Sequence, residues 1–244
     1  MFQFAILPFV FILAVGSSAL YLTSINTVTT HPGQKARPAI TNIIPDQSLP
    51  TKSLATDLVR DFNPTKGPKD AKVTVIEFLD FQCPACKAIH PVEINVSKKY
   101  DSKVRFVFKM FPLKAIHPNA ESAAKSALAA AKQGKYFEYA DKLFANQSEP
   151  GINLTNQEQF AKDLGLNLDQ WKQDRESAEI EKYIKTDYSD GVNAQIPNVS
   201  NPLQTDSIDS TPTFVFIKNG KIQYKTNGLT TDEFSQKLDE LLQN

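Results

Sequence analysis

Hydrophobic residues along the chain follow first the pattern of buried strands and then that of helices. Val73–Leu79 is a nearly continuous, β-branched apolar run, which is typical of a strand buried on both faces. Residues 87–97 follow with helical character, and Val104–Lys109 has strand character again. This order of strand, helix and strand predicts a β-α-β unit, and therefore a parallel pair in one sheet.

A long helical region is predicted after this unit. Residues 119–133 are rich in alanine, and apolar residues between Tyr136 and Phe144 recur at helical spacing. A further helix is predicted over Leu168–Asp187. These helices separate the first two strands from the remainder of the sheet.

Capping motifs predict where two helices begin. Thr155 and Glu158 match a capping box, and Gly165 is the expected stop of the helix that follows. Thr230 and Glu233 match the same motif at the start of the last helix.

The C-terminal part returns to strands after a polar loop over residues 190–210. Thr213–Lys218 has the composition of a strand, and Lys221–Lys225 is expected to pair with it. Asn219-Gly220 between them is a strong signal for a tight hairpin turn.

The N-terminal residues differ from the rest because Phe2–Thr23 carry no charged side chain. A helix of this length would span roughly 33 Å, enough to cross a bilayer. Two interpretations remain open: a retained membrane anchor over residues 1–23, which we favour, or a signal peptide cleaved near Ser17-Ser18-Ala19. Residues 24–55 are rich in proline and polar residues, and we expect a flexible linker.

Net charge is zero, with 27 basic and 27 acidic residues. Because nucleic-acid binders usually carry basic patches, this balance argues against that class. Lys35 and Arg37 follow the apolar N-terminal run, which mildly opposes export of the chain by the positive-inside rule.

The chain has only two cysteines, Cys83 and Cys86, and both lie in one C-x-x-C motif between the predicted strand and helix. That context favours a redox-active dithiol. Half of a zinc site is an alternative, for which the chain offers only His31, His90 and His117 as histidine ligands. Two ordinary buried thiols are the other alternative.

The position of the motif predicts different roles for the two thiols. Cys83 is expected at the helix N-terminus, where unpaired N–H groups and the helix dipole lower the pKa of a thiol. We therefore expect Cys83 to be exposed and to attack, while Cys86 lies one turn further and resolves the mixed disulfide. Pro84 suits an early helical position, where its missing N–H group has little effect.

Three segments resemble the DsbA-like branch of the thioredoxin fold. They are Gly67–Cys86, Phe111-Pro112-Leu113 with the following His117, and Thr211–Phe214. The resemblance covers about residues 60–243 and implies an α/β, thioredoxin-like fold with an inserted helical domain.

The spacing of the motifs agrees with such an insertion. Pro212 follows Cys86 by 126 residues, whereas a parallel crossover needs only about a dozen. We expect one domain over residues 56–244, with the helical insertion at about 112–190.

The resemblance also implies a substrate-binding loop. Thr211-Pro212 matches the family's cis-proline loop, whose backbone docks substrate beside Pro84 and Ala85 of the C-x-x-C motif. A trans proline that opens a strand is the alternative for Pro212.

Glu77 lies within the buried strand, six residues before Cys83. A carboxyl buried there would have a raised pKa and could exchange a proton with Cys86, as the resemblance also implies. The alternative is a glutamate at the strand edge that faces solvent. Asp80 is expected to be structural or at the surface. His90 shares a helix face with Cys86, so copper binding by His90 and both cysteines is one interpretation, and an ordinary surface histidine is the alternative.

The resemblance implies an extracytoplasmic thiol–disulfide oxidoreductase that introduces disulfides into exported, cysteine-containing proteins. It further implies reoxidation by a quinone-linked membrane thiol oxidase. We expect no cofactor, a monomer, and membrane attachment through residues 2–23. A disulfide reductase or isomerase on the same scaffold is one alternative, and a copper- or metal-binding module is another. Because the segment over residues 194–210 is longer and more polar than in the family, substrate preference is not transferred.

Overall fold

The computed structural model describes residues 58–148, 151–198, 201 and 204–243. The predicted N-terminal anchor or signal segment and the linker lie outside this range. Within the described residues, no helix is both long enough and apolar enough to span a bilayer.

A five-stranded sheet forms the centre of the fold, with the strand order β1-β3-β2-β6-β7. Its strands are β1 (Thr65–Lys66), β2 (Val73–Leu79), β3 (Val104–Met110), β6 (Thr213–Lys218) and β7 (Lys221–Thr226). The β2–β3 pair is parallel, as the β-α-β pattern predicts, and the other pairs are antiparallel. The predicted tight turn between β6 and β7 is confirmed, because Asn219 and Gly220 both have positive φ.

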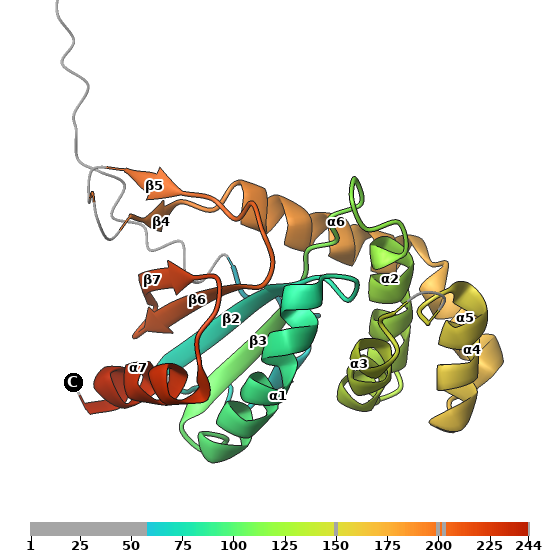
Figure 1. Cartoon of the computed structure of the whole chain (residues 1–244), viewed down its shortest axis with the longest axis horizontal. Coiled ribbons are helices and arrows are strands. Elements are labelled where there is room, and N and C mark those ends of the chain that lie inside the picture. The colour runs from blue at the N-terminus through green and yellow to red at the C-terminus, as the bar shows by residue number, and fades with distance from the viewer. Residues whose placement is uncertain (1–57, 149–150, 199–200, 202–203, 244) are drawn as a thin grey trace, which may run out of the picture. The chain divides into compact units, whose positions relative to one another are not determined.

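Helices cover both faces of this sheet and extend beyond one side of it (Figure 1). They are α1 (Pro84–Lys99), α2 (Ala120–Ala131), α3 (Tyr136–Ala145), α4 (Leu154–Asp163), α5 (Leu168–Arg175), α6 (Ala178–Val192) and α7 (Thr231–Gln243). Helices α1 and α7 lie on one face, whereas α2 to α5 gather at the side of α1 (Figure 1). Two short strands, β4 (Ile196–Pro197) and β5 (Thr205–Asp206), form a separate hairpin.

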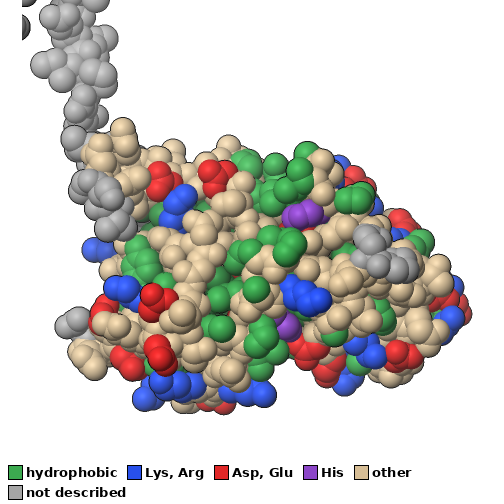
Figure 2. All heavy atoms as spheres, viewed as in Figure 1, with side chains coloured by type: hydrophobic (Ala, Val, Ile, Leu, Met, Phe, Trp, Pro, Cys, Tyr) green, Lys and Arg blue, Asp and Glu red, His purple; other side chains and the backbone are tan. Residues whose placement is uncertain are grey.

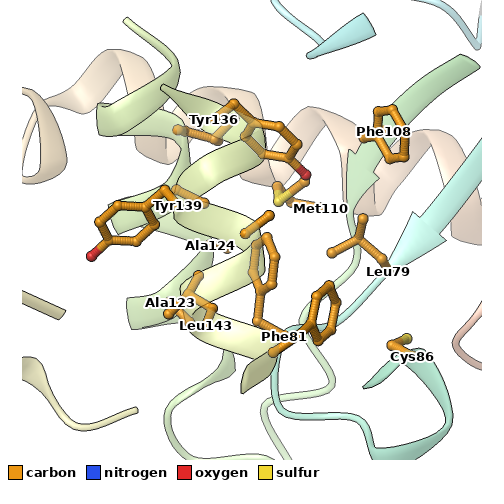
Figure 3. Packing of buried hydrophobic residues seen from close by; sticks show 14 of the residues in the cluster. Leu79, Phe81, Cys86, Phe108, Met110, Ala123, Ala124, Tyr136, Tyr139 and Leu143 are labelled. Atoms are coloured by element: carbon orange, nitrogen blue, oxygen red, sulfur yellow. The ribbon is translucent and has the colours of Figure 1, made fainter. Parts of the chain in front are cut away.

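Two hydrophobic clusters hold these layers together. The larger cluster joins one sheet face to α1, α7 and the helices between β3 and β4. Figure 3 shows part of it, where Phe81 and Leu79 of the sheet side meet Ala123 and Ala124 of α2 and Leu143 of α3. The smaller cluster lies on the opposite sheet face, where Phe78, Ile76 and Val107 pack beneath the β4–β5 region. Cys86 belongs to the larger cluster, so the C-x-x-C motif is anchored in the main core.

A buried ionic network fixes α6 to the sheet. Lys109 of β3 is 0% exposed, and its Nζ lies 2.9 Å from Asp187 Oδ1 and 2.8 Å from Asp190 Oδ2. The same ammonium donates to the Leu58 carbonyl at 2.9 Å. Arg60 completes the network with a 2.7 Å ion pair to Asp190. The first described residues, β3 and α6 are thereby joined at one place.

The predicted start of α4 is wrong by two residues. Asn153 rather than Thr155 caps the helix, because the Asn153 side chain accepts the N–H of Asn156 at 3.0 Å. Thr155 lies inside the first turn. The expected stop is confirmed, since Gly165 follows the helix with φ of 68°. The capping box at Thr230 is confirmed as well, with the Glu233 carboxylate 2.8 Å from the Thr230 backbone nitrogen.

Leu168–Asp187 is not one helix but parts of two. The chain breaks between α5 and α6, where the Ser177 hydroxyl donates to the Asp174 carbonyl at 2.6 Å and accepts the Ile180 N–H at 3.2 Å. One serine thus serves the end of α5 and the start of α6. The predicted loop over residues 190–210 is also corrected, because α6 continues to Val192 and the β4–β5 hairpin follows.

Candidate active site around Cys83 and Cys86

Helix α1 places the two cysteines one turn apart at its N-terminus. Cys83 is the N-cap residue, Pro84 is the first helical residue, and the first turn contains no acidic side chain. Both cysteines are free thiols in this structure. The backbone N–H of Cys83 donates to the Asp80 carbonyl at 3.1 Å, which fixes the turn between β2 and α1. The helix dipole therefore acts on Cys83 without a competing carboxylate in that turn.

Cys83 is less exposed than the sequence predicts, at 6%, while Cys86 is 0% exposed. The difference arises because the loop before β6 covers Cys83: its Sγ donates to the Thr211 carbonyl at 3.2 Å. Pro84 and Ala85 remain exposed beside it. The backbone of this loop therefore lies directly against the Cys83 sulfur.

The environment of Cys83 stabilises its thiolate. The thiol of Cys86, which donates toward Cys83, lowers the pKa of Cys83 from its usual 9.0 to about 5, against the opposing effect of burial. Thr211 and the backbone N–H groups of Cys86 and Ala85 contribute further to this lowering. Cys83 is therefore ionised at neutral pH, which is the reactive form of a thiol.

Cys86 has the opposite property. Burial raises its pKa well above the usual value, and the nearby Cys83 and Glu77 raise it further. The two thiols therefore differ strongly in acidity, as the predicted division into an attacking and a resolving thiol requires.

The Thr211–Pro212 peptide bond is cis, so the predicted cis proline is confirmed. Side-chain hydrogen bonds hold this loop in place. The Thr213 hydroxyl donates to the Ser210 carbonyl at 2.8 Å, and the Asn227 side-chain amide donates to the Thr213 hydroxyl at 2.9 Å. The Thr211 hydroxyl is buried and has no hydrogen-bond partner among the described residues. It is therefore available to donate to Cys83 once that thiol is ionised.

Glu77 is 3% exposed, so the alternative of a solvent-facing glutamate is wrong. It lies in the middle of the sheet, with Phe108 of β3 and Phe214 of β6 as its register partners. Burial raises its pKa well above 4.5, and Glu93 of α1 raises it further, although Lys66 acts in the opposite direction. A buried carboxyl with a raised pKa is thus held beside Cys86.

Asp80 is structural rather than a surface residue. Its carboxylate accepts the N–H of Gln82 at 2.7 Å and that of Leu113 at 2.8 Å. The same group lies 2.8 Å from His117 Nδ1. It therefore ties the loop after β3 to the turn that carries Cys83.

His90 is engaged away from the two sulfurs. Its ring nitrogens contact Glu93 at 3.3 Å and Asp141 at 2.8 Å, so both have carboxylate partners. Among the described residues, no group of three or more His, Cys, Asp or Glu side chains is placed to hold a metal ion. His31, another histidine ligand that the sequence offers, lies outside the described range.

The structure adds two residues that sequence reasoning missed. The Gln147 side chain donates to the carbonyls of Phe81 at 3.0 Å and Cys83 at 2.7 Å, which connects the end of α3 to the motif. Glu93 lies beside Glu77. A signal for Glu93 exists, because it lies seven residues after Cys86 and hence on the same helix face. Gln147 has no signal in the sequence.

The arrangement supplies an ionised thiol, a second thiol of raised pKa and a buried carboxyl of raised pKa, next to the Thr211 backbone. Histidine and hydrophobic side chains reach the surface on the face shown in Figure 2, and most of the charged side chains visible there lie nearer its periphery. These groups suffice for thiol–disulfide exchange without a cofactor.

Comparisons with known proteins place this fold. A family model described as thioredoxin matches residues 62–240. The Na(+)/H(+) antiporter NhaA 3 of Salinispora tropica is 38% identical over 113 residues, which are 46% of this chain and 17% of that protein. NhaA 1 of Mycobacterium sp. (strain KMS) is 29% identical over 182 residues, which are 73% of this chain and 27% of that protein. The chain thus spans about a fifth to a quarter of the length of these curated relatives.

Solved structures resemble the chain over most of its length. Wolbachia pipientis alpha-DsbA1 has a TM-score of 0.64 at 23% identity, covering 78% of this chain and 96% of that one. BdbD from Bacillus subtilis has a TM-score of 0.59 at 21% identity, covering 75% and 94%. This likeness confirms the predicted thioredoxin-like fold with inserted helices. Because the family model matches most of its length, the chain belongs to the thioredoxin family, with the fold of the DsbA-like proteins.

Proposed function

We propose that this protein is a thiol–disulfide oxidoreductase that acts as a disulfide oxidase through Cys83 and Cys86. The observation that carries the proposal is the Cys83 sulfur, which is held at the α1 N-terminus against the Thr211 carbonyl with a pKa of about 5. A neighbour of similar fold, alpha-DsbA2 of Wolbachia pipientis, is described as a thiol-disulfide exchange protein.

The acidity of Cys83 favours oxidation of substrates over their reduction. At pH 7, a thiol of pKa about 5 is more stable than one of pKa 9.0 by about 2.7 kcal/mol, at 1.36 kcal/mol per pKa unit. This energy stabilises only the reduced enzyme, because the disulfide has no thiolate. It corresponds to a reduction potential about 60 mV more oxidising.

The proposed cycle begins with the Cys83–Cys86 disulfide. A substrate thiolate attacks Cys83 Sγ, so a mixed disulfide forms and Cys86 leaves as a thiolate, which takes the proton of Glu77. A second substrate thiolate then attacks the substrate sulfur of the mixed disulfide and expels the Cys83 thiolate. The substrate loses two electrons and gains a disulfide, and the enzyme is left reduced, with Cys83 as a thiolate and Cys86 as a thiol. Glu77 then regains a proton from solvent.

Substrate recognition is assigned to the backbone around the reactive sulfur. We propose that an extended substrate segment lies along Thr211 and Pro212, with Pro84 and Ala85 on its other side. Backbone recognition of this kind is tolerant of side-chain sequence, which suits an enzyme with many substrates.

The cellular setting is part of the proposal. We propose that the protein acts outside the cytoplasm on exported, cysteine-containing proteins, attached to the membrane through residues 2–23. A quinone-linked membrane thiol oxidase would restore its disulfide. Sodium–proton antiport is not assigned to this chain, because the match covers only 17–27% of the antiporters.

The reduction potential of the full chain, equilibrated in glutathione buffers in mild detergent, tests the proposed direction. A value toward about −120 mV would support the oxidase, whereas one near about −270 mV would make the protein a reductase. Incubation of the oxidised protein with a reduced two-cysteine peptide measures directly whether the protein oxidises a substrate. Cys83→Ser should abolish exchange, and reduced Cys86→Ser mixed with an oxidised peptide should trap the mixed disulfide. A Cys86→Ser protein with normal turnover would refute the assigned roles.

A further inference from the structure

A continuous row of titratable side chains leads from Cys86 to the surface. Glu77 of β2 lies beside Cys86 and next to Glu93 of α1. Glu93 Oε2 lies 3.3 Å from His90 Nδ1, and His90 Nε2 lies 2.8 Å from Asp141 Oδ1. Asp141 of α3 is the outer end, because its side chain is 57% exposed. The cycle described above uses only the first of these groups.

The inner pair consists of two buried carboxyl groups. Glu77 and Glu93 lie within hydrogen-bond reach of each other, which requires a proton on one of them. Glu77 Oε2 is buried and has no hydrogen-bond partner among the described residues, so it is a free acceptor for the Cys86 proton. Lys66 of β1 lies 4.0 Å from Glu93 Oε1 and balances negative charge on the pair.

The outer half is a histidine held between two carboxylates from different helices. His90 packs against the Phe144 ring at 4.5 Å between centroids, so its orientation is fixed from α3. Burial alone would lower the pKa of His90, but Glu93 and Asp141 outweigh it and raise that pKa above 6.5. A histidine that is hydrogen-bonded at both ring nitrogens can accept a proton at one and release it at the other.

We propose that Glu93, His90 and Asp141 form a proton relay that connects Glu77, and through it Cys86, with solvent. This inference rests on the proposed function, since it assigns a route for the proton of the resolving thiol. Glu93 and His90 contact no reacting sulfur in the structure described here and act through Glu77, so they are positioning residues.

Protons and electrons are both accounted for when Cys86 closes the disulfide. Glu77 first passes its own proton to Glu93, which delivers it to His90 Nδ1 while His90 Nε2 releases a proton to Asp141 and water. Glu77 then accepts the Cys86 proton. The Cys86 thiolate attacks Cys83 Sγ in a mixed disulfide, the Cys83–Cys86 bond forms, and the departing thiolate takes the electron pair. One proton leaves the protein for each disulfide closed.

Further titratable side chains lie near the inner end of this row, beside Glu77 and Glu93. Tyr136 of α3 has a buried hydroxyl without a hydrogen-bond partner there, and it lies within electrostatic reach of Glu77 and Glu93. Lys66 and Cys86 also lie within electrostatic reach of Glu77.

A two-phase reaction of the full chain, reduced and in mild detergent, with dithiobis(nitrobenzoate) separates the two thiols. The first phase releases one thionitrobenzoate as Cys83 forms a mixed disulfide with the reagent. The second phase releases another as Cys86 resolves it, and this step requires the Cys86 proton to leave. Glu93→Gln and His90→Gln keep hydrogen-bonding groups of similar size but interrupt the relay. Glu138→Gln is the control, because Glu138 lies on the same helix as Asp141 and pairs with Lys135 instead.

The relay predicts a second phase slowed at least about tenfold at pH 7 in His90→Gln and Glu93→Gln, with the first phase within about twofold. The second-phase pH profile should lose its inflection in His90→Gln. His90→Ala should regain rate with added imidazole, which a purely structural role would not produce. A second phase unchanged in both glutamine variants, or slowed as much in Glu138→Gln, overturns the relay.

A wrong proposed function would give a different result: the unaltered protein would lack the first phase, in which Cys83 reacts with the reagent. The relay is then decided by NMR titration of His90, whose pKa should fall in Glu93→Gln and in Asp141→Asn. An unchanged His90 pKa in both variants overturns it.

Discussion

Removal of the Cys86 thiol should raise the pKa of Cys83 by at least about one unit. The pKa of Cys83 lies near 5, about four units below its usual 9.0. Four donors lower it: the Cys86 thiol, Thr211 and two backbone N–H groups, while burial opposes them. The four lowering effects together therefore exceed four units, and the largest exceeds one. That largest effect is the Cys86 thiol, so Cys86→Ala should weaken the thiolate by at least about 1.4 kcal/mol.

Thiolate absorbance near 240 nm, followed against pH, measures this shift directly. The rate of Cys83 alkylation by iodoacetamide supplies an independent curve. Thr211→Val is the matched comparison, because it removes a smaller contribution and leaves both cysteines in place. The expected order of Cys83 pKa values is unaltered protein, Thr211→Val, then Cys86→Ala as the highest. If Cys83 still titrates near 5 in Cys86→Ala, the helix N-terminus and not the second thiol controls its acidity, and our assignment is refuted.

Three further changes test the fold and the buried charges by urea unfolding. Because the folded-state pKa of Glu77 is raised, its contribution to stability is full below the unfolded pKa and is lost as pH rises through the folded pKa. The free energy of unfolding of Glu77→Gln should therefore equal that of the unaltered protein near pH 4 and exceed it by about 1–3 kcal/mol at pH 8. No gain at pH 8 would contradict the burial argument. Lys109→Met leaves the buried Asp187 carboxylate without its cationic partner and should destabilise the fold by about 3–5 kcal/mol. Lys142→Met is the control, because it breaks a partly exposed ion pair and should change stability by no more than about 1 kcal/mol. Equal losses of stability in Lys109→Met and Lys142→Met would contradict the buried network. Gly191→Ala places a Cβ 2.7 Å from a phenylalanine ring and should destabilise by about 1–3 kcal/mol, whereas an added Cβ at Gly228 meets nothing within 4 Å among the described residues.

Strands and site residues were predictable where one strong local pattern determined the outcome. Val73–Leu79 has the same bounds in the structure as in the prediction, because a continuous β-branched run between polar residues has no competing helical interpretation. The C-x-x-C motif and the Thr211-Pro212 dipeptide are likewise local signals, and the structure brings them into contact.

Predictions failed where neighbouring residues offered equivalent chemistry. Asn153 and Thr155 can both cap a helix, and the sequence contains no information on which one the packing of α4 selects. The break at Ser177 is hidden because Leu168–Asp187 contains neither glycine nor proline to mark it. Glu93 and Gln147 join the site through contacts between elements, which no single segment reveals.

The contact between Cys83 and Thr211 joins residues 128 positions apart in the chain. A ribosome adds about 5–20 residues per second, so Thr211 is made on the order of 6–26 s after Cys83. During that interval the nascent chain carries both cysteines on their own strand and helix, without the loop that later covers them. Both the cover over Cys83 and the restriction of its access therefore arise only after Thr211 has been made. An oxidant that meets the chain before that point encounters a more open dithiol than the folded protein presents.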